Sequence, residues 1–453
     1  MIIKKYITII LLIITQVSIA QNLRKCNTTF LVEKSIQEDK RNLISLEETA
    51  IKNYKWITEN KQTNHSIITI PIVVHIIHKN THANIGSGTN ISNAQIEDAI
   101  RILNEDFNKN NPAFPNPPRN TFTNLAADVQ IQFCLAATDE NGNPTNGVTR
   151  TSTTKSDFDP DTEANDMKRN NTGGKDGWDP EKYLNIWVCN LAVSPSGGMT
   201  LGYSYLPGSV AWQMWKDGLV VDFQYFGTIG ASSPGNDGST TTHEIGHYLG
   251  LMHTFCEQTD ASGNATCCDN DDNNWGGYID DTPASKDIYW GSVNNSTNNN
   301  TCNDISYNND FNTNVLDMDE NFMSYSSDVW MFTHEQSAVM NGTMNGYRNS
   351  LKNSPASVNC SGTVGISNIL DNNQIRIYPN PTKGKILIQN LTHYKTDNII
   401  IRNILGEIII TNNNVVNSLV SLDLSKFENG IYFIEIYTGN GKRIEKIILQ
   451  SND

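Results

Sequence analysis

Runs of apolar residues separated by polar loops predict the elements in the first three quarters of the chain. IITIPIVVHIIH (67–78) is dense in β-branched residues and predicts a buried strand. Residues 92–107 carry apolar side chains at spacings of three and four, which predicts an amphipathic helix with Ser92 and Gln95 as a capping box. Further strands are predicted in VQIQFCLA, YLNIWVCNL, LGYSYLP and DGLVVDFQYFG. A strand, a helix and several strands ahead of a second helix favour an α/β (α+β) domain.

The second predicted helix carries the most concentrated chemistry, in TTHEIGHYLGLMHTF. Ser239 is its predicted N-cap, and Gly250 is its predicted end, because glycine readily adopts the left-handed conformation of a C-terminal cap. His243 and His247 lie one turn apart, so both imidazoles point from the same face. The bend after Gly250 lets His253 approach the same point from another side.

Three histidines at one point predict a zinc site with one coordination position left open for water. Glu244 lies beside the first histidine and can take a proton from that water as it attacks a carbonyl, then pass the proton to the leaving amine. The predicted reaction is peptide-bond hydrolysis. A short HExxH alone arises by chance often enough to be weak evidence, but the full HExxHxxGxxH is far more specific.

The remaining histidines show no ligand spacing, and ordinary structural roles are predicted for them. They are His65, His75, His78, His82, His334 and His393.

Composition narrows the class of protein and its location. The 453 residues contain 33 basic and 48 acidic side chains, and the net charge of −15 argues against nucleic acid or anionic lipid as a partner. Residues 1–20 place two lysines before a short apolar run that ends in Ser-Ile-Ala, which predicts a secretory signal peptide. A membrane anchor is the alternative, but the run is short, so we expect a mature chain with no membrane span.

Export allows the eight cysteines to form disulfides. Cys134 and Cys189 both lie in strand-like segments, which suggests a cross-strand disulfide between them. At least one further local disulfide is predicted within a second group, comprising Cys256, Cys267, Cys268 and Cys302.

The pattern changes after about residue 350. Residues 353–373 are rich in small and turn-forming residues, typical of a linker. Residues 374–453 contain short alternating strands at regular spacing, which predicts a small all-β sandwich without a catalytic group.

The motif HEIGHYLGLMH (243–253) resembles the zinc signature of the metzincin metallopeptidases, and NFMSYSSD (321–328) resembles their Met-turn. With DDTPA (280–284), these segments are similar to the pappalysin family and specifically to its bacterial secreted members. The resemblance assigns Met323 to the base beneath the metal. It assigns Tyr325 to a position near the zinc, where its hydroxyl stabilises the developing oxyanion.

The resemblance spans residues 67 to 350 and implies a metzincin-like catalytic domain over 66–352. A twisted sheet and the zinc helix form its upper half, and LGYSYLP (201–207) is the rim strand against which a peptide substrate pairs. LRKCNTT (23–29) resembles the cysteine motif of pappalysin propeptides, so 21–65 is predicted to be a propeptide whose Cys26 thiolate occupies the open zinc position. A disulfide is the alternative role for Cys26.

Two departures from the family pattern concern a disulfide and substrate choice, and a nearby acidic run is a candidate calcium site. The family disulfide that joins the segment after DTP to the segment after the Met-turn is not expected, because no cysteine stands in either place. Asp328 is close to the acidic residue that selects arginine in relatives, but Val329 stands at the expected position, so no arginine preference is predicted. The run DNDDNN (269–274) offers oxygen ligands for calcium, and the resemblance suggests Asp281 and Thr282 as ligands; a solvated acidic loop is the alternative.

The segments IYPNPTKGKILI and NGIYFIEIYTGNGKRIEKIIL resemble the C-terminal sorting domain of the type IX secretion system. That resemblance implies the secretion machinery as a partner; a carbohydrate-binding or adhesive sandwich is the alternative. We therefore expect a secreted zinc endopeptidase that acts on proteins or peptides and is made as a zymogen. The competing class is an inactive metzincin-fold adhesin or binding protein with a structural metal site.

Overall fold

The computed structural model describes most of the chain and divides it into two compact units. The described residues are 26–60, 67–114, 116–193, 198–268, 279–307, 310–357, 375–390, 396–403, 408–415, 419–438 and 441–450. One unit contains residues 1–136 and 147–358, and the other contains 137–146 and 359–453. The predicted signal peptide lies outside the described residues. Within them, no helix has the length and apolar character needed to cross a membrane.

A six-stranded sheet forms the centre of the first unit. Its strands are β1 (Ile68–Lys79), β2 (Ile131–Leu135), β3 (Val148–Thr153), β4 (Leu184–Cys189), β5 (Gly202–Ser204) and β6 (Leu219–Asp222). They follow the order β2-β1-β4-β6-β5, and β3 pairs with the second half of β1. All pairs are parallel except β5 with β6, so β5 is an antiparallel edge strand.

Five of the six strands were predicted from their apolar runs, and β3 was missed. β1 is buried along almost its whole length, which explains why it reads as a continuous apolar run. β3 reads VTRTST, and most of its residues are half-exposed or exposed. Its pairing with β1 therefore creates a strand that has no hydrophobic pattern of its own.

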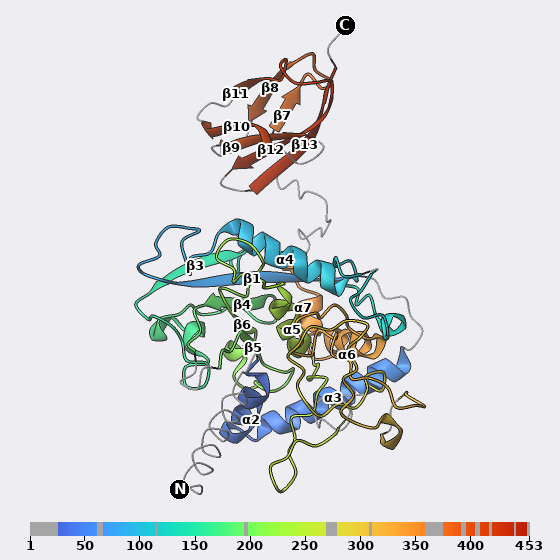
Figure 1. The fold of residues 1–453 in the computed structure, drawn as a ribbon. Helices are drawn as coiled ribbons and strands as arrows, with labels where there is room; N and C mark the ends of the chain where they lie inside the picture. Colours follow the sequence, from blue (N-terminus) through green and yellow to red (C-terminus); the bar gives the residue numbers. More distant parts are fainter. Residues whose placement is uncertain are drawn as a thin grey trace, which may run out of the picture. The chain divides into compact units, whose positions relative to one another are not determined.

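The predicted helix after β1 is α4 (Asn93–Phe107), which lies along β1 in Figure 1. Ser92 caps it, because its Oγ accepts a hydrogen bond from the Gln95 backbone N at 3.1 Å. The reciprocal half of the predicted capping box is wrong. The Gln95 side chain instead donates to the backbone oxygens of Phe223 and Phe226, both at 2.9 Å, and so ties α4 to the loop after β6.

The second predicted helix is α5 (Ser239–Tyr248), and its start differs from the prediction. Gly238, in a left-handed conformation, is the N-cap, and Ser239 is the first helical residue. The Ser239 amide donates to Asp237 at 2.9 Å. The predicted end is confirmed: Gly250 has φ +103°, and the chain reverses through a hydrogen bond from Leu251 N to Gly246 O at 2.9 Å.

The described residues of this unit contain four more helices: α2 (Thr28–Glu38), α3 (Arg41–Glu59), α6 (His334–Asn345) and α7 (Asn349–Lys352). Short 3-10 segments are η1 (Thr123–Leu125), η2 (Asp166–Lys168), η3 (Asn170–Thr172), η4 (Met214–Lys216), η5 (Asp304–Ser306) and η6 (Pro355–Ser357). In Figure 1, α2 lies near β5, and α3 runs beside α6. Leu31, Val32, Leu46 and Ile57 of the first two helices are buried. Residues 26–60 therefore pack on the sheet-containing unit.

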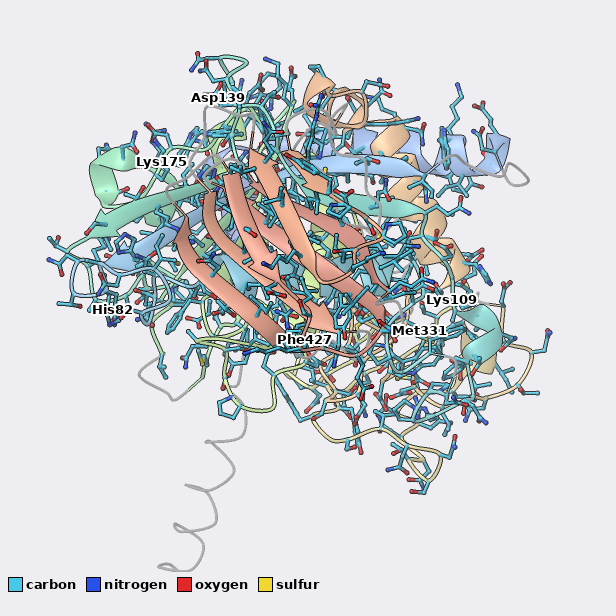
Figure 2. The ribbon with its side chains drawn as sticks, turned by 90° about the horizontal axis from the view of Figure 1, so that it is seen from above. His82, Lys109, Asp139, Lys175, Met331 and Phe427 are labelled. Atoms are coloured by element: carbon cyan, nitrogen blue, oxygen red, sulfur yellow. A yellow bond between two sulfur atoms is a disulfide. The ribbon has the colours of Figure 1, made fainter. Side chains whose placement is uncertain are left out.

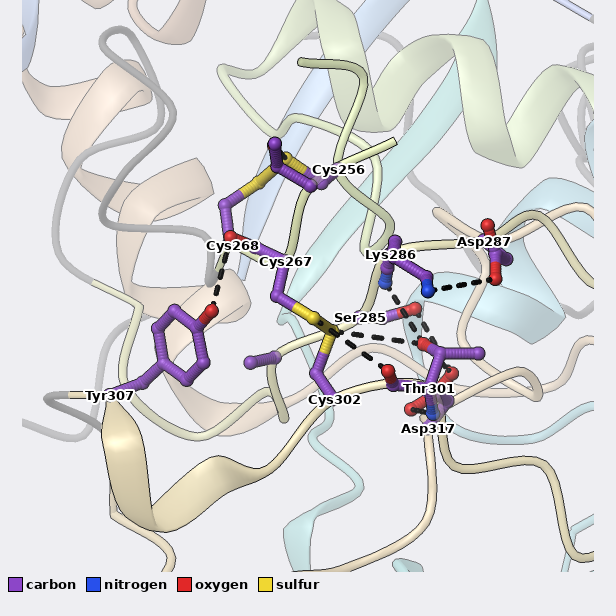
Figure 3. Close-up of a disulfide and its surroundings, with 12 residues drawn as sticks. Cys256, Cys267, Cys268, Ser285, Lys286, Asp287, Thr301, Cys302, Tyr307 and Asp317 are labelled. Atoms are coloured by element: carbon purple, nitrogen blue, oxygen red, sulfur yellow. Dashed lines mark hydrogen bonds and ion pairs between the residues drawn. A yellow bond between two sulfur atoms is a disulfide. The ribbon is translucent and has the colours of Figure 1, made fainter. Parts of the chain in front are cut away.

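Two disulfides link the long irregular segment after α5 (Figure 3). They join Cys256 to Cys268 and Cys267 to Cys302, which confirms the prediction of a local disulfide in this group. Thr301 adds to this region by donating its hydroxyl to Asp317 at 2.6 Å. Because the segment has little regular structure, these covalent links restrict it where backbone ladders do not.

The predicted disulfide between Cys134 and Cys189 is wrong. Cys189 is a free, fully buried thiol, and Cys134 is disulfide-bonded elsewhere. The reason is strand order: β1 lies between β2, which carries Cys134, and β4, which carries Cys189. Strands two positions apart are separated by about 9–10 Å, and a disulfide requires Cα atoms within about 7 Å.

The second unit consists of two antiparallel sheets, as the alternating pattern predicted. Its strands are β7 (Ile375–Tyr378), β8 (Lys385–Asn390), β9 (Thr396–Asn403), β10 (Ile408–Val415), β11 (Leu419–Asp423), β12 (Gly430–Thr438) and β13 (Gly441–Leu449). One sheet has the order β10-β9-β12-β13 and the other β11-β8-β7. Isoleucines dominate the buried core between them, and Phe427, labelled in Figure 2, packs at its border.

Candidate metal centre and active site

The three motif histidines converge on one point. His243 and His247 project from α5, and the turn at Gly250 returns the chain so that His253 faces them. Their Nε2 atoms lie 3.1 Å apart for His243 and His247, 3.1 Å for His247 and His253, and 3.2 Å for His243 and His253. All three side chains are buried. The spacing in sequence therefore produces a compact cluster of ring nitrogens.

The opposite ring nitrogens show why this cluster suits a cation. His243 Nδ1 and His247 Nδ1 each lie 2.7 Å from a backbone oxygen, of Phe322 and Leu251 respectively. A carbonyl only accepts, so each Nδ1 carries the proton and each Nε2 presents a lone pair. Lone pairs that face each other at about 3 Å repel unless a positive charge lies between them. Burial lowers the pKa of His247 well below its usual value, with His253 and His243 adding to the shift, so protonation does not relieve this repulsion.

The distances also fit zinc. Two nitrogens bound tetrahedrally at a Zn–N distance of about 2.0–2.1 Å lie about 3.3 Å apart. Neutral imidazole is a ligand that zinc favours, and three protein ligands are typical of catalytic zinc. The sulfur of Cys26 joins the three histidines in a four-residue group whose ligand atoms all lie within 4.8 Å of one another.

Glu244 lies beside this centre and is fully buried. Its Oε2 accepts hydrogen bonds from the Cys26 thiol and the Thr28 hydroxyl, both at 3.5 Å. Its Oε1 has no hydrogen-bond partner among the described residues. Burial raises the pKa of Glu244 well above its usual value. The carboxyl group is therefore desolvated and only weakly held.

Tyr325 and Met323 lie where the Met-turn meets the histidines. The Tyr325 hydroxyl is 3.1 Å from His253 Nε2, and its ring packs edge-on against that imidazole with centroids 5.0 Å apart. Burial raises the pKa of Tyr325 well above its usual value, so the hydroxyl remains a donor. Met323 is fully buried beneath α5, where a Cβ added to Gly246 would meet its sulfur at 2.4 Å.

Residues 26–28 lie along the edge strand of the sheet. Cys26 forms a parallel bridge with Gly202 of β5, and Asn27 N donates to Gly202 O at 3.3 Å. Ser204 N donates to the Thr28 hydroxyl at 3.0 Å. The predicted rim strand is thus paired with the predicted propeptide, and this pairing holds Cys26 at the histidines.

Three residues near the centre were missed by sequence reasoning. Glu257 Oε2 lies 3.2 Å from His253 Nδ1 and accepts a hydrogen bond from Thr29 at 2.5 Å. Phe255 stacks on His253 with ring centroids 4.7 Å apart. Gly202 allows Glu244 to lie against β5, because an added Cβ would be 2.9 Å from Glu244 Cγ. The spacing of four between His253 and Glu257 was the available signal.

The contacts of Asp281, one of the two suggested calcium ligands, are with α6 and the residue before it. Asp281 Oδ1 accepts from the Thr333 hydroxyl at 2.6 Å, and its Oδ2 accepts from Glu335 N at 2.9 Å. Asp281 therefore supports the N-terminus of α6. Thr282 is buried. The acidic run 269–274 lies outside the described residues, and calcium binding stays a prediction.

Asp328 and Val329 also have defined surroundings. Asp328 Oδ2 accepts from the Ser292 hydroxyl at 2.6 Å and from Val293 N at 2.9 Å. Val329 is partly buried against the main core.

The described histidines outside the motif do not join the cluster. His75 is fully buried between Thr149 and Asn185, His82 pairs with Thr89, and His334 begins α6. His65 and His393 lie outside the described residues.

The sheet, the helix that carries two histidines, the third histidine beyond a glycine turn and the buried methionine together define a metzincin-type metallopeptidase. Comparison with models of protein families narrows this class to one family. Residues 166–345 match the model described as "Pregnancy-associated plasma protein-A", and residues 376–450 match "Secretion system C-terminal sorting domain". The chain therefore belongs to the pappalysin family of metallopeptidases and carries a C-terminal domain for export by the type IX secretion system.

Solved structures agree with this assignment. Mature mirolysin of Tannerella forsythia in complex with a cleaved peptide is 34% identical, with a TM-score of 0.53, over 64% of this chain and 96% of that one. A variant of promirolysin from the same organism is 31% identical, with a TM-score of 0.56, over 73% of this chain and 97% of that one.

Curated relatives are fungal extracellular metalloproteases. The Pyricularia oryzae protein is 30% identical over 222 residues, which are 48% of this chain and 58% of the relative. The Arthroderma gypseum protein is 27% identical over 242 residues, 53% of this chain and 61% of the relative. The alignments thus span less than two thirds of each relative's length.

Proposed function

We propose that this chain is an extracellular zinc-dependent endopeptidase that is made in a latent form. The convergence of three histidine Nε2 atoms within 3.2 Å of one another, beside a buried glutamate, is the observation that carries the proposal. His243, His247 and His253 would hold the zinc. When bound, the metal supplies a Lewis acid that activates water and polarises the scissile carbonyl.

The chain's own residues provide the proton transfers and charge stabilisation. Glu244, with one oxygen unpartnered among the described residues, takes the proton of the attacking water and returns it to the leaving amine. The Tyr325 hydroxyl donates to the oxygen of the carbonyl as negative charge develops there. Once residues 26–28 leave the edge of the sheet, strand β5 offers backbone groups with which an extended peptide pairs.

The position of Cys26 supports the proposal of latency. Its sulfur would supply a fourth ligand and displace the catalytic water, and its backbone already occupies the edge of β5. The burial of α2 and α3 residues against the catalytic unit holds this arrangement. Removal of the segment by proteolysis would free both the metal and the strand edge.

Hydrolysis of a denatured protein by the purified, activated chain tests the catalytic proposal. Glu244→Gln is expected to lower kcat by at least about 100-fold, the lower range for a general base. Zinc affinity, measured by competition with a chelating dye, should remain, because the three ligands are unchanged. Glu97→Gln, a matched change at an exposed glutamate on α4, should leave both unchanged. Activity that survives both Glu244→Gln and metal removal would refute the proposal.

A time course of autoprocessing tests the latency proposal. Cys26→Ala should process and become active earlier than the wild-type chain. Cys189→Ala is the matched control, since Cys189 is the other free cysteine among the described residues and lies away from the histidines. Equal time courses for Cys26→Ala and the wild-type chain would contradict the role of the thiol.

A further inference from the structure

A loop next to the Met-turn is held in place by hydrogen bonds. Ser327 N donates to Gly291 O at 3.1 Å. Asp328 Oδ2 accepts from both the Ser292 hydroxyl and Val293 N. These three bonds join residues 291–293 to residues 327–328. Asp328 therefore acts as a staple between the loop and the Met-turn.

Trp290 immediately precedes this stapled segment and lies beside the metal centre. Its ring centroid is 5.3 Å from that of Tyr325, whose hydroxyl is 3.1 Å from His253 Nε2. The Trp290 side chain keeps 37% of its surface exposed, whereas Tyr325 is buried at 5%. The indole thus extends the aromatic surface around the histidines outward to solvent.

From this placement we propose that Trp290 is a specificity-determining residue, the wall of a subsite that receives a large apolar, preferably aromatic, side chain of the substrate. The inference rests on the proposed endopeptidase function. A peptide whose scissile bond lies at the histidines must place a neighbouring side chain close to Tyr325, and Trp290 borders that space.

The surrounding chemistry favours an apolar occupant over a cationic one. The rings of Tyr325, Phe255 and Trp290 are linked by contacts, with Phe255 and Tyr325 centroids 4.8 Å apart. Asp328 is the acidic residue tied to this loop, and one of its oxygens already accepts two hydrogen bonds. Aromatic rings prefer to pack against other rings at such distances.

A peptide-library digest read by mass spectrometry tests the proposal. The wild-type enzyme should enrich aromatic and large aliphatic residues at one position next to the scissile bond. Trp290→Ala should reduce kcat/KM for the best aromatic peptide by roughly 10–200-fold, the range for a lost apolar pocket contact, while a glycine-containing peptide changes little. Trp290→Phe should restore most of the preference, which a general loss of structure would not do.

Asp328→Asn separates the two roles in this loop. The staple requires an acceptor oxygen, which asparagine keeps, so the aromatic preference should persist in this variant. An unchanged profile in Trp290→Ala, or an arginine preference that disappears in Asp328→Asn, would overturn the inference. Absence of any hydrolysis by the wild-type enzyme would instead contradict the proposed function, so the two failures are distinguishable.

Discussion

The contact between α5 and the Met-turn leads to a sharp prediction for Gly246→Ala. Gly246 lies in the last turn of α5, one residue before His247, and its open side faces the sulfur of Met323. A Cβ at this position would be 2.4 Å from Met323 Sδ and 3.3 Å from its Cε. The first distance is more than about 1 Å shorter than the favourable separation of about 3.5–4.0 Å between heavy atoms. Met323 is fully buried, so its side chain has little room to retreat.

The magnitude follows from two opposing effects. Replacing glycine by alanine inside a helix stabilises the folded state by about 1 kcal/mol, because alanine loses less backbone entropy. Overpacking of a filled core costs about 1–3 kcal/mol. Gly342 in α6 is a matched control, since its added Cβ would meet Asn53 and Trp56 at 3.5 Å, an ordinary contact. The difference between the two substitutions removes the helix term and leaves about 1–3 kcal/mol.

Urea unfolding of the metal-free chain, followed by fluorescence, measures this difference. Gly342→Ala should stabilise the chain slightly, and Gly246→Ala should be less stable than Gly342→Ala by the overpacking cost. In a Met323→Ala background, where the clashing sulfur is absent, Gly246→Ala should no longer be destabilising. If Gly246→Ala stabilises the wild-type chain as much as Gly342→Ala does, the reasoning about the close contact is refuted.

Three further predictions concern buried groups and the turn after α5. Burial lowers the pKa of His75 from 6.5 to about 4, so the folded chain keeps its imidazole neutral. The folding stability that depends on this neutral imidazole is complete above pH 6.5 and is lost as the pH falls toward 4. The difference corresponds to about 3 kcal/mol at 1.36 kcal/mol per pH unit, and His75→Gln should flatten the pH dependence of unfolding in that range relative to the wild type. Arg348→Met should destabilise the fold by about 3–5 kcal/mol in a thermal or urea melt, because it leaves the buried Asp217 carboxylate without its two hydrogen bonds of 2.7 and 3.0 Å. Adding Asp217→Asn to this variant should recover part of the lost stability. Gly250→Ala should cost about 1–2 kcal/mol in the same melt, because φ +103° is strained for alanine; an unchanged melting curve would contradict that turn geometry.

Local patterns predicted the elements that depend on neighbours in sequence. The spacing of apolar residues located α4 and β1, and the offsets among His243, His247 and His253 located the cluster of ring nitrogens. Such features depend on helix periodicity and on one glycine turn, which are the same in any fold. The start of α5 was wrong by one residue because Gly238, rather than a side chain, provides the cap.

The predictions from sequence were wrong where the order and pairing of strands determined the structure. Cys134 and Cys189 each lie in a correctly predicted strand, but β1 separates those strands. β3 was missed because its pairing with β1, and not its own pattern, makes it a strand. Neither result could be read from local periodicity, since register and neighbour choice involve residues far apart in the chain.

The sequence by itself determined that three imidazoles, a glutamate and a terminating glycine belong to one metal-binding segment, because these groups lie within eleven residues and helix geometry alone brings most of them together. Only the tertiary structure decided which distant groups complete the site. It brings Cys26 to within 3.5 Å of Glu244 across 218 residues, Tyr325 to within 3.1 Å of His253 across 72 residues, and Trp290 to the ring of Tyr325. These contacts depend on the packing of the N-terminal helices and on the hydrogen bonds of the long segments that follow α5, which no local pattern specifies.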